Sequence, residues 1–244
     1  MTDAIRLASK DAVATITIDR ASDGNQLTIA MLRELAAAFR DAGKSDAKVI
    51  ALRTTGHEFC LGRDPRGGPP PGPPPNALQM RNNLITPILD VYDAISAAPQ
   101  PVVCSVQGAA MGFGCALATS CDITIASQAA RFCLPELEKN LPPTLAISAM
   151  MSRVPQKALI WLVYSMHEID AQAALRLGLV SYVVPPAQLE TQSDKLIDEL
   201  CTRSRDTLVG VKDYFRVAPT LQGRAASDLA GNLLATVFSS VPRG

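Results

Sequence analysis

The stretch "MGFGCALATSCD", residues 111–122, is the strongest indicator of the fold class. It follows the strand-like segment "PVVCSVQ" (101–107), and Gly112 and Gly114 stand where the chain would turn from a strand into a helix. Small and apolar residues follow, so we expect a buried helix. The first turn of a helix has backbone N–H groups without helical partners. Because the stretch holds no reactive side chain besides two cysteines and Asp122, it predicts main-chain amides that bind an oxyanion or a phosphate.

Strands and helices alternate on both sides of this stretch. Segments 4–9 and 13–19 predict a hairpin, Thr28 is a candidate N-cap for a helix over 29–39, and a helix over 76–98 is expected to kink at Pro87. Further strands are predicted at 48–55, 122–127, 130–135 and 179–184, and further helices at 112–121, 144–154, 156–166, 170–178, 194–204, 206–217 and 225–238. This order predicts an α/β fold, with a core over residues 1–185 and a helical C-terminal region over 186–244.

The charge and composition argue against several classes of protein. There are 23 basic and 23 acidic side chains, so the formal net charge is zero and no basic surface for nucleic acid is expected. No apolar run reaches the roughly 18 residues of a membrane span, and the N-terminal sequence lacks the features of a secretory signal. Six cysteines lie mostly in apolar stretches, which predicts buried thiols in a reducing compartment. We therefore expect a cytoplasmic protein with no membrane or nucleic-acid partner.

Two other kinds of site find little support in the sequence. The glycines at 112 and 114 form G-x-G without the third glycine, or the acidic residue about 20 positions later, of a dinucleotide-binding loop. The two histidines, His57 and His167, are expected on the surface or in turns. We therefore predict no metal site.

A proline-rich segment interrupts the alternation at residues 65–75, "PRGGPPPGPPP". Proline lacks a backbone N–H and has a fixed φ, so this segment cannot form a helix or a central strand. The composition predicts a surface loop in an extended conformation. The alternative is a PxxP ligand for another protein, which would make the chain an interaction module.

Four segments fall in the order and at about the spacing of a known family. They are "IDRASDGNQLTIAMLREL" (18–35), "TGHEFCLGRD" (55–64), "PQPVVCSVQGAAMGFGCALATSCDITIASQAARFCLPE" (99–136) and "EIDAQAALRLGLVSYVVP" (168–185). Over roughly residues 4–240 the chain resembles the crotonase superfamily, the enoyl-CoA hydratase/isomerase family. The resemblance implies a crotonase-like spiral core of strand-strand-helix (ββα) units and C-terminal helices that form a homotrimer or hexamer. It also implies an acyl-CoA thioester substrate, as in fatty acid metabolism, with no separate cofactor because coenzyme A is part of the substrate.

The resemblance also assigns the reacting groups. Backbone N–H groups of Arg63 and Phe113 would bind the thioester oxygen next to the Gly112 turn, and Glu136 would carry protons. Hydratases of the family have a second glutamate, whose place is taken here by Ala116. One carboxylate is enough to move a proton between two carbons. The resemblance therefore implies enoyl-CoA isomerisation, or hydration of an unusual enoyl-CoA such as a ring-containing one. The alternative is a non-catalytic acyl-CoA-binding homologue that lost one acid.

The resemblance places the coenzyme A part of the substrate near the loop "DRASDGNQ". Arg20 would lie near a phosphate, Asn25 would brace the loop, and the backbone of Leu61 and Gly62 would lie near the adenine. From the residues alone, Arg20 is equally well interpreted as a surface arginine. Asp64 is expected to cap the turn that follows the oxyanion donor.

Two further acids are candidates for structural roles. Asp122 is expected to anchor the start of a strand. Glu138 is expected to be solvated, with a position in the cavity as the alternative. Without the family resemblance, Glu136 itself would be interpreted as an exposed glutamate beside a proline.

Overall fold

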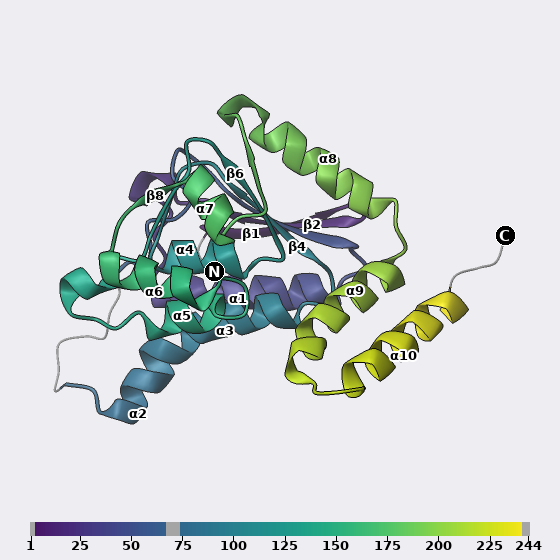
Figure 1. The fold of residues 1–244 in the computed structure, drawn as a ribbon. Helices are drawn as coiled ribbons and strands as arrows, with labels where there is room; N and C mark the ends of the chain where they lie inside the picture. Colours follow the sequence, from purple (N-terminus) through teal and green to yellow (C-terminus); the bar gives the residue numbers. More distant parts are fainter. Residues whose placement is uncertain (1–2, 67–73, 241–244) are drawn as a thin grey trace.

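The protein has a six-stranded main sheet and a second sheet of three short strands (Figure 1). The computed structural model describes residues 3–66 and 74–240. The main sheet has the order β1 (Ile5–Lys10), β2 (Val13–Ile18), β3 (Val49–Thr54), β4 (Val102–Val106), β6 (Ile123–Ser127) and β9 (Tyr182–Val184). The second sheet consists of β5 (Ala109–Met111), β7 (Arg131–Cys133) and β8 (Ile169–Asp170). In the main sheet the β1–β2 hairpin is antiparallel and the other pairs are parallel.

Helices cover both faces of the main sheet, as the predicted α/β class requires. They are α1 (Ile29–Lys44), α2 (Ala77–Met80), α3 (Thr86–Ala97), α4 (Phe113–Ser120), α5 (Thr144–Met150), α6 (Gln156–Ser165), α7 (Ala171–Leu177), α8 (Leu189–Cys201), α9 (Arg205–Val217) and α10 (Ala225–Ser240). The predicted cap of α1 is confirmed, since the Thr28 side chain accepts a hydrogen bond from the Met31 amide at 3.4 Å. The predicted strand over 179–184 is shorter than expected and begins at Tyr182.

Strand β3 shows why the sheet is covered on both sides. Alternate side chains point to opposite faces of a strand. Ile50 and Leu52 belong to the large core that contains the buried residues of α1, whereas Val49 and Ala51 pack with Ile197 of α8. All four strand residues are buried. A continuous apolar run is therefore what this central position in the sheet requires.

The predicted helix over 76–98 is divided by a π turn. Helix α2 ends at Met80, Arg81–Ile85 forms the π turn, and α3 begins at Thr86. Pro87 has no amide hydrogen, so it cannot donate the helical hydrogen bond to the carbonyl of Asn83, four positions earlier. The π turn thus lies where this hydrogen bond is missing, and the chain continues from it directly into α3.

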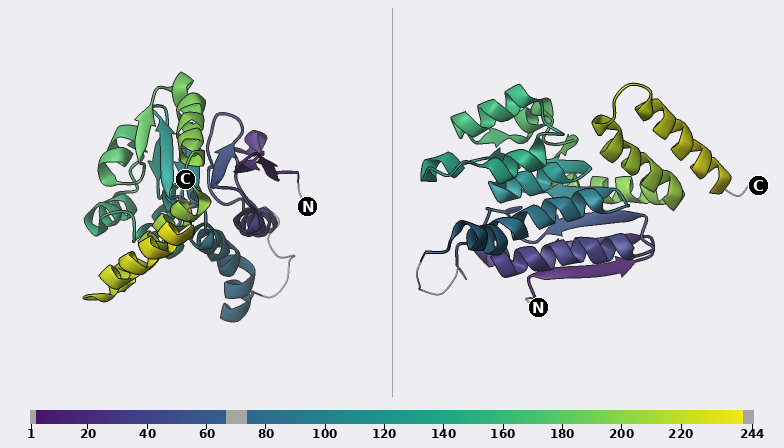
Figure 2. Two further views of the ribbon diagram at one scale, coloured as in Figure 1. Left: turned by 90° about the vertical axis from the view of Figure 1, so that its right-hand side faces the viewer. Right: turned by 90° about the horizontal axis from the view of Figure 1, so that it is seen from below.

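The C-terminal helices extend the molecule beyond the sheet. Helix α8 lies on the sheet and contacts β3, β4 and β6. Helices α9 and α10 pack against each other and project to one side of the body (Figure 2). The division at residues 185 and 186 stays a prediction, because α8 shares the face of the sheet formed by the earlier part of the chain.

One buried cation attaches α9 to the core. Lys212 is 8% exposed. Its Nζ forms an ion pair with Asp122 at 2.7 Å and donates hydrogen bonds to the carbonyls of Ile95 and Gln100 at 3.0 and 2.9 Å. Burial lowers the pKa of Lys212, and the Asp122 carboxylate opposes that shift.

The prediction of buried thiols is confirmed for most cysteines, whereas the prediction for the proline-rich segment is not tested. All six cysteines are free; five are buried, as predicted, and Cys201 is half-buried. Most of the proline-rich segment, residues 67–73, lies outside the described residues. Among the helices described in full or in part, none is both long and apolar enough to cross a membrane.

Candidate active site

The two glycine-containing bends lie side by side. Cys60 forms a parallel bridge with Ala110: the Cys60 amide donates to the Ala109 carbonyl at 3.0 Å, and the Met111 amide donates to the Cys60 carbonyl at 2.9 Å. The approach explains a glycine in the second bend. A Cβ on Gly114 would lie 2.1 Å from the Cys60 carbonyl oxygen, a distance that no side chain tolerates.

The N–H group of Arg63 points away from Leu27. The Gly62 carbonyl accepts a hydrogen bond from the Leu27 amide at 3.1 Å, and the Asp64 amide donates to the Leu27 carbonyl at 2.9 Å. In a trans peptide the N–H points opposite to the preceding carbonyl. The Arg63 N–H therefore points away from Leu27, and the Met111 carbonyl oxygen lies close enough to Gly62 that a Cβ there would be 3.2 Å from it.

The Phe113 N–H lies at the start of α4. Gly112 has a φ of 53° and is the N-cap of α4, so Phe113 is the first residue of the helix. Its amide belongs to the helical turn whose N–H groups have no partner within the helix. The Gly112 amide itself donates to the Cys133 carbonyl at 2.9 Å. This hydrogen bond brings the end of β7, and the residues that follow it, to the bend.

Glu136 reaches the bend from the turn after β7. It begins the 3-10 turn Glu136–Lys139, and its Oε1 lies so close to Gly112 that a Cβ there would be 2.8 Å away. Glu136 Oε2 is buried and is the one carboxylate oxygen of the described residues that is enclosed without a hydrogen-bond partner. Burial raises the pKa of Glu136. The arrangement places the Glu136 carboxylate against the bend that precedes the Phe113 amide.

Apolar and aromatic groups surround this carboxylate. The rings of Phe113 and Tyr92 stack with centroids 5.7 Å apart and planes 25° apart. Ala116 is fully buried on α4, so its position supplies no second acid. Glu138 is exposed, as its solvated interpretation predicted. Sequence reasoning placed no function on Tyr92, because helical periodicity identifies it only as part of the buried face of its helix.

Arg20 is not the plain surface arginine that one interpretation of the sequence allowed. Its side chain is 16% exposed and forms ion pairs with Asp64 at 2.7 Å and Asp23 at 3.3 Å. It also donates to the Gln26 carbonyl at 2.6 Å. The guanidinium thus holds the loop together through protein acceptors, and its contact with a phosphate stays a prediction.

Asn25 braces the loop as predicted. It is fully buried and has a φ of 54°, in the left-handed region that asparagine tolerates. Its Nδ2 donates to the carbonyls of Thr55 and Glu58, both at 2.8 Å, and its Oδ1 accepts from the Arg20 amide at 2.9 Å. One side chain therefore joins this loop to the segment that leads into the first bend.

The other residues predicted for coenzyme A have mainly structural contacts. Asp64 accepts a hydrogen bond from the Arg66 amide at 2.8 Å, which confirms the predicted turn cap. The Arg66 side chain holds the pKa of Asp64 well below its usual range. The Leu61 amide donates to the Gly24 carbonyl at 2.9 Å. The adenine contacts of Leu61 and Gly62 stay predictions.

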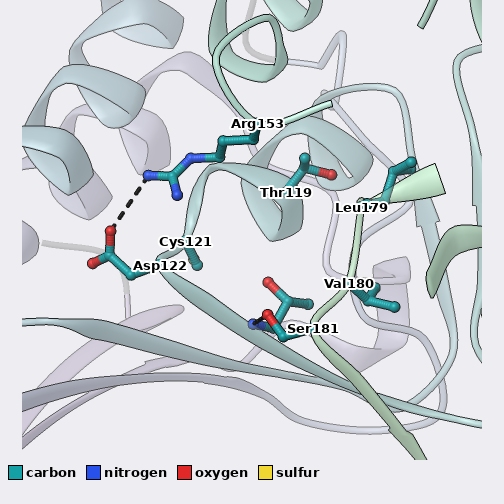
Figure 3. Close-up of a pocket in the computed structure, with 9 residues that line it drawn as sticks. Thr119, Cys121, Asp122, Arg153, Leu179, Val180 and Ser181 are labelled. Carbon is teal, nitrogen blue, oxygen red and sulfur yellow. Dashed lines mark hydrogen bonds and ion pairs between the residues drawn. The ribbon is translucent and has the colours of Figure 1, made fainter. Parts of the chain in front are cut away.

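A polar pocket at the opposite end of α4 is separate from this site (Figure 3). Its volume is about 260 Å³, and it is lined by Thr119, Cys121, Asp122, Thr124, Arg153, Gly178, Leu179, Val180 and Ser181. Arg153 forms an ion pair with Asp122 at 3.4 Å (Figure 3). Asp122 also accepts a hydrogen bond from the Val102 amide at 2.8 Å, so its predicted role at a strand start is confirmed. The pocket is thus a junction of structural contacts.

The histidines lie away from the bends. His57 and His167 are both exposed, and the rings of His167 and Trp161 pack nearly at right angles with their centroids 5.9 Å apart. Within residues 3–66 and 74–240, no cluster of three or more histidine, cysteine or acidic side chains is arranged to hold a metal ion.

Comparison with known proteins agrees with the fold. The chain is 32% identical over 187 residues to a probable enoyl-CoA hydratase of Rhodobacter capsulatus, which covers 76% of this chain and 70% of the relative. It is 28% identical over 215 residues to the mitochondrial enoyl-CoA hydratase domain-containing protein 3 of Rattus norvegicus, covering 86% and 69% of the two chains. The crystal structure of an enoyl-CoA hydratase of Mycobacterium smegmatis superimposes with a TM-score of 0.90 at 25% identity, over 98% of this chain and 92% of that one.

A sequence model of one family spans nearly the whole chain. The family is described as enoyl-CoA hydratase/isomerase, and its model matches residues 8–243. The matched region contains both glycine-containing bends and Glu136. The chain therefore belongs to the enoyl-CoA hydratase/isomerase family, the crotonase superfamily.

Proposed function

We propose that the protein catalyses proton transfer at the carbon next to an acyl-CoA thioester, through an enolate. The thioester oxygen binds to the N–H groups of Arg63 and Phe113, and Glu136 moves the proton. One observation carries the proposal: the Glu136 carboxylate, whose Oε2 is buried without a hydrogen-bond partner, lies against Gly112, directly before the Phe113 amide. Loss of one such donor in other enzymes lowers the rate by about 10²- to 10³-fold.

Isomerisation of a 3-enoyl-CoA follows from these groups alone. Glu136 removes a proton from the α carbon, and the electrons of that C–H bond move toward the thioester oxygen, where the two amides stabilise the negative charge. Glu136 then returns the same proton to the γ carbon, and the double bond shifts to the α,β position. Hydration of a 2-enoyl-CoA passes through the same enolate, with a water oxygen bonded to the β carbon. The family description, enoyl-CoA hydratase/isomerase, is in keeping with either reaction, and the name of the probable enoyl-CoA hydratase of Rhodobacter capsulatus is in keeping with hydration.

The test follows deuterium into the substrate. The protein is incubated in deuterated water with crotonyl-CoA, a 3-enoyl-CoA, an alicyclic enoyl-CoA and a saturated acyl-CoA. We expect deuterium at the α carbon with wild type, and at least a 10²-fold slower exchange with Glu136→Gln. Glu138→Gln is the matched control, because Glu138 is an exposed glutamate in the same turn, and it should exchange at the wild-type rate. Equal rates for wild type and Glu136→Gln would contradict the proposal.

A non-catalytic acyl-CoA-binding protein is the second candidate, favoured by the absence of an acid at Ala116. Calorimetric titration with a saturated acyl-CoA separates the two. Binding by wild type without any deuterium incorporation would establish the binding role. Incorporation that is lost in Glu136→Gln, while binding is retained, would establish the enzyme.

We further propose that the chain forms a homotrimer through α9 and α10. A cavity of about 310 Å³ between these helices is lined mostly by apolar side chains, among them Val211, Phe215, Leu233 and Leu234. Phe215 is 75% exposed and Leu234 is 59% exposed. An apolar surface of this kind on a projecting pair of helices is typical of a contact between subunits, and we take the partner to be a second copy of this chain.

A further inference from the structure

Tyr92 is a second polar residue at the bend that Glu136 reaches. It lies on α3 with only 6% of its surface exposed, and its ring stacks on that of Phe113. Phe113 directly follows Gly112, against which the Glu136 carboxylate lies. Two elements far apart in the sequence, α3 and the turn after β7, thus bring the Tyr92 ring and the Glu136 carboxylate to the same bend, close enough for the carboxylate charge to act on the phenol.

The hydroxyl of Tyr92 is available to a ligand. It makes no hydrogen bond to any other residue in the described part of the chain, and it is not one of the fully enclosed side-chain atoms there that lack a partner. Within that part of the chain the hydroxyl therefore has its donor free for a ligand. Burial, and after it the Glu136 carboxylate, raise the pKa of Tyr92. The phenol therefore stays protonated and acts as a hydrogen-bond donor, while Glu136 acts as an acceptor.

The other polar side chains at this bend do not match Tyr92 as donors. The thiols of Cys60 and Cys115 are buried, and burial raises the pKa of Cys60 to about 12. A protonated thiol is a weak hydrogen-bond donor. Arg63 contributes its main-chain amide, and its side chain is exposed.

We propose that Tyr92 is a catalytic residue for hydration, whose hydroxyl holds the water molecule that Glu136 deprotonates. The inference rests on the proposed function, because it uses the same enolate and the same base. It gives Tyr92 the positioning task that a second glutamate would perform at position 116, where Ala116 has no polar atom in its side chain. The substrate class follows: 2-enoyl-CoA thioesters that take up water.

The reaction balances with these groups alone. The water oxygen accepts a hydrogen bond from Tyr92 and donates one to Glu136. Glu136 takes that proton while the oxygen bonds to the β carbon and the electrons of the double bond move to the thioester oxygen. Glu136 then gives the proton to the α carbon. Both added groups come from one water molecule, and Tyr92 keeps its own proton throughout.

The test compares two reactions of the full-length protein. Tyr92→Phe keeps the ring that stacks on Phe113 and removes only the hydroxyl. We expect it to slow hydration of crotonyl-CoA or an alicyclic enoyl-CoA on the order of 10²-fold. Exchange of the α proton of a saturated acyl-CoA with deuterated water needs only Glu136 and the two amides, so its rate should change by less than about 2-fold. Tyr164→Phe is the matched control, because Tyr164 is 74% exposed, and it should leave both rates unchanged.

The outcomes distinguish this inference from the proposed function. Loss of both reactions in Glu136→Gln, with loss of hydration alone in Tyr92→Phe, supports both. Unchanged hydration in Tyr92→Phe, or equal loss of hydration and exchange, overturns the role of Tyr92 and leaves the enolate chemistry standing. Wild type that exchanges α protons and adds no water to either substrate also overturns it. Retention of both reactions in Glu136→Gln overturns the proposed function itself. Thermal unfolding of each variant verifies that it is folded.

Discussion

Glu136 is a residue in which burial opposes ionisation. Its pKa is raised from the ordinary value of 4.5 by burial, so the folded protein binds this proton more tightly than the unfolded chain does. Linkage then requires that the free energy of unfolding falls as pH rises from 4.5 through the folded-state pKa. Above the folded-state pKa, the buried negative charge lowers the free energy of unfolding by its full amount. Below pH 4.5, Glu136 is protonated in both the folded and the unfolded chain, so this cost is absent.

We therefore expect Glu136→Gln to be more stable than wild type at pH 8. The gain should be at most about 1 kcal/mol, because the variant removes a half-buried charge that a backbone hydrogen bond and Lys139 offset only in part. At pH 4 the two proteins should be equally stable. Urea titrations at both values measure this, with the exposed Glu138→Gln as the control that shows no such dependence. A variant less stable than wild type at pH 8 would contradict the assignment.

The same residues show what sequence reasoning can reach. Only the family resemblance, through a "PE" pair about twenty residues after the glycine turn, singled out Glu136; local pattern alone indicated an exposed glutamate, whereas its Oε2 is buried. Tyr92 was not, because its contact with Phe113 joins segments far apart in the chain, and periodicity indicates only that it faces the core. Arg20 was ambiguous for a similar reason: its partner Asp64 comes close only after the intervening helix and strand have packed.

The pair of bends is the element that places the amides, and Gly114 is its tightest point. A Cβ at this position would meet the Cys60 carbonyl oxygen at 2.1 Å. Since the carbonyl belongs to the backbone, it cannot rotate away as a side chain would. Relief requires the bends to separate, which would also separate the N–H groups of Arg63 and Phe113.

Gly114→Ala should therefore lose both stability and activity. We expect a loss of roughly 1–3 kcal/mol in the free energy of unfolding, as for other overpacked sites, and a larger fractional loss of α-proton exchange than of acyl-CoA binding. Gly231→Ala is the matched control. No atom lies within 4 Å of a Cβ at Gly231 in α10, and the substitution should stabilise by about 0.5–1 kcal/mol because alanine favours helices. Equal effects of the two substitutions would show that the close approach is unimportant.

Most secondary-structure elements follow from local pattern. The alternation of apolar and polar residues predicted β2, and a continuous apolar run predicted β3. Both faces of β3 are buried, which explains that run. The π turn at Arg81–Ile85 was not predicted in detail, although Pro87 indicated an irregularity nearby. The pairing of Cys60 with Ala110 had no local signal, because a single bridge depends on how two loops pack.

At the scale of the whole molecule, the exposed apolar face of α9 and α10 determines the expected assembly. One chain has a mass of 25.9 kDa. We expect light scattering after size-exclusion chromatography to give about three times that mass, or about six times if trimers pair. The double substitution Phe215→Glu with Leu234→Glu should shift the protein to the mass of one chain, because it places two charges in the apolar cavity.

Leu7→Glu is the control for this experiment. Leu7 is 40% exposed on the edge strand β1, away from the C-terminal helices, so its substitution should leave the mass unchanged. A monomeric wild type would contradict the proposed assembly, and so would a double variant that keeps the wild-type mass.

Lys212 connects this assembly to the chemistry. The carbonyls that it binds, those of Ile95 and Gln100, stand at the end of α3 and just after it, and α3 carries Tyr92. A subunit that docks against α9 would therefore pull on the same helix that carries the hydroxyl. If subunits assemble through α9, a change at that surface would act on α3 at Ile95, three residues or about one helical turn from Tyr92.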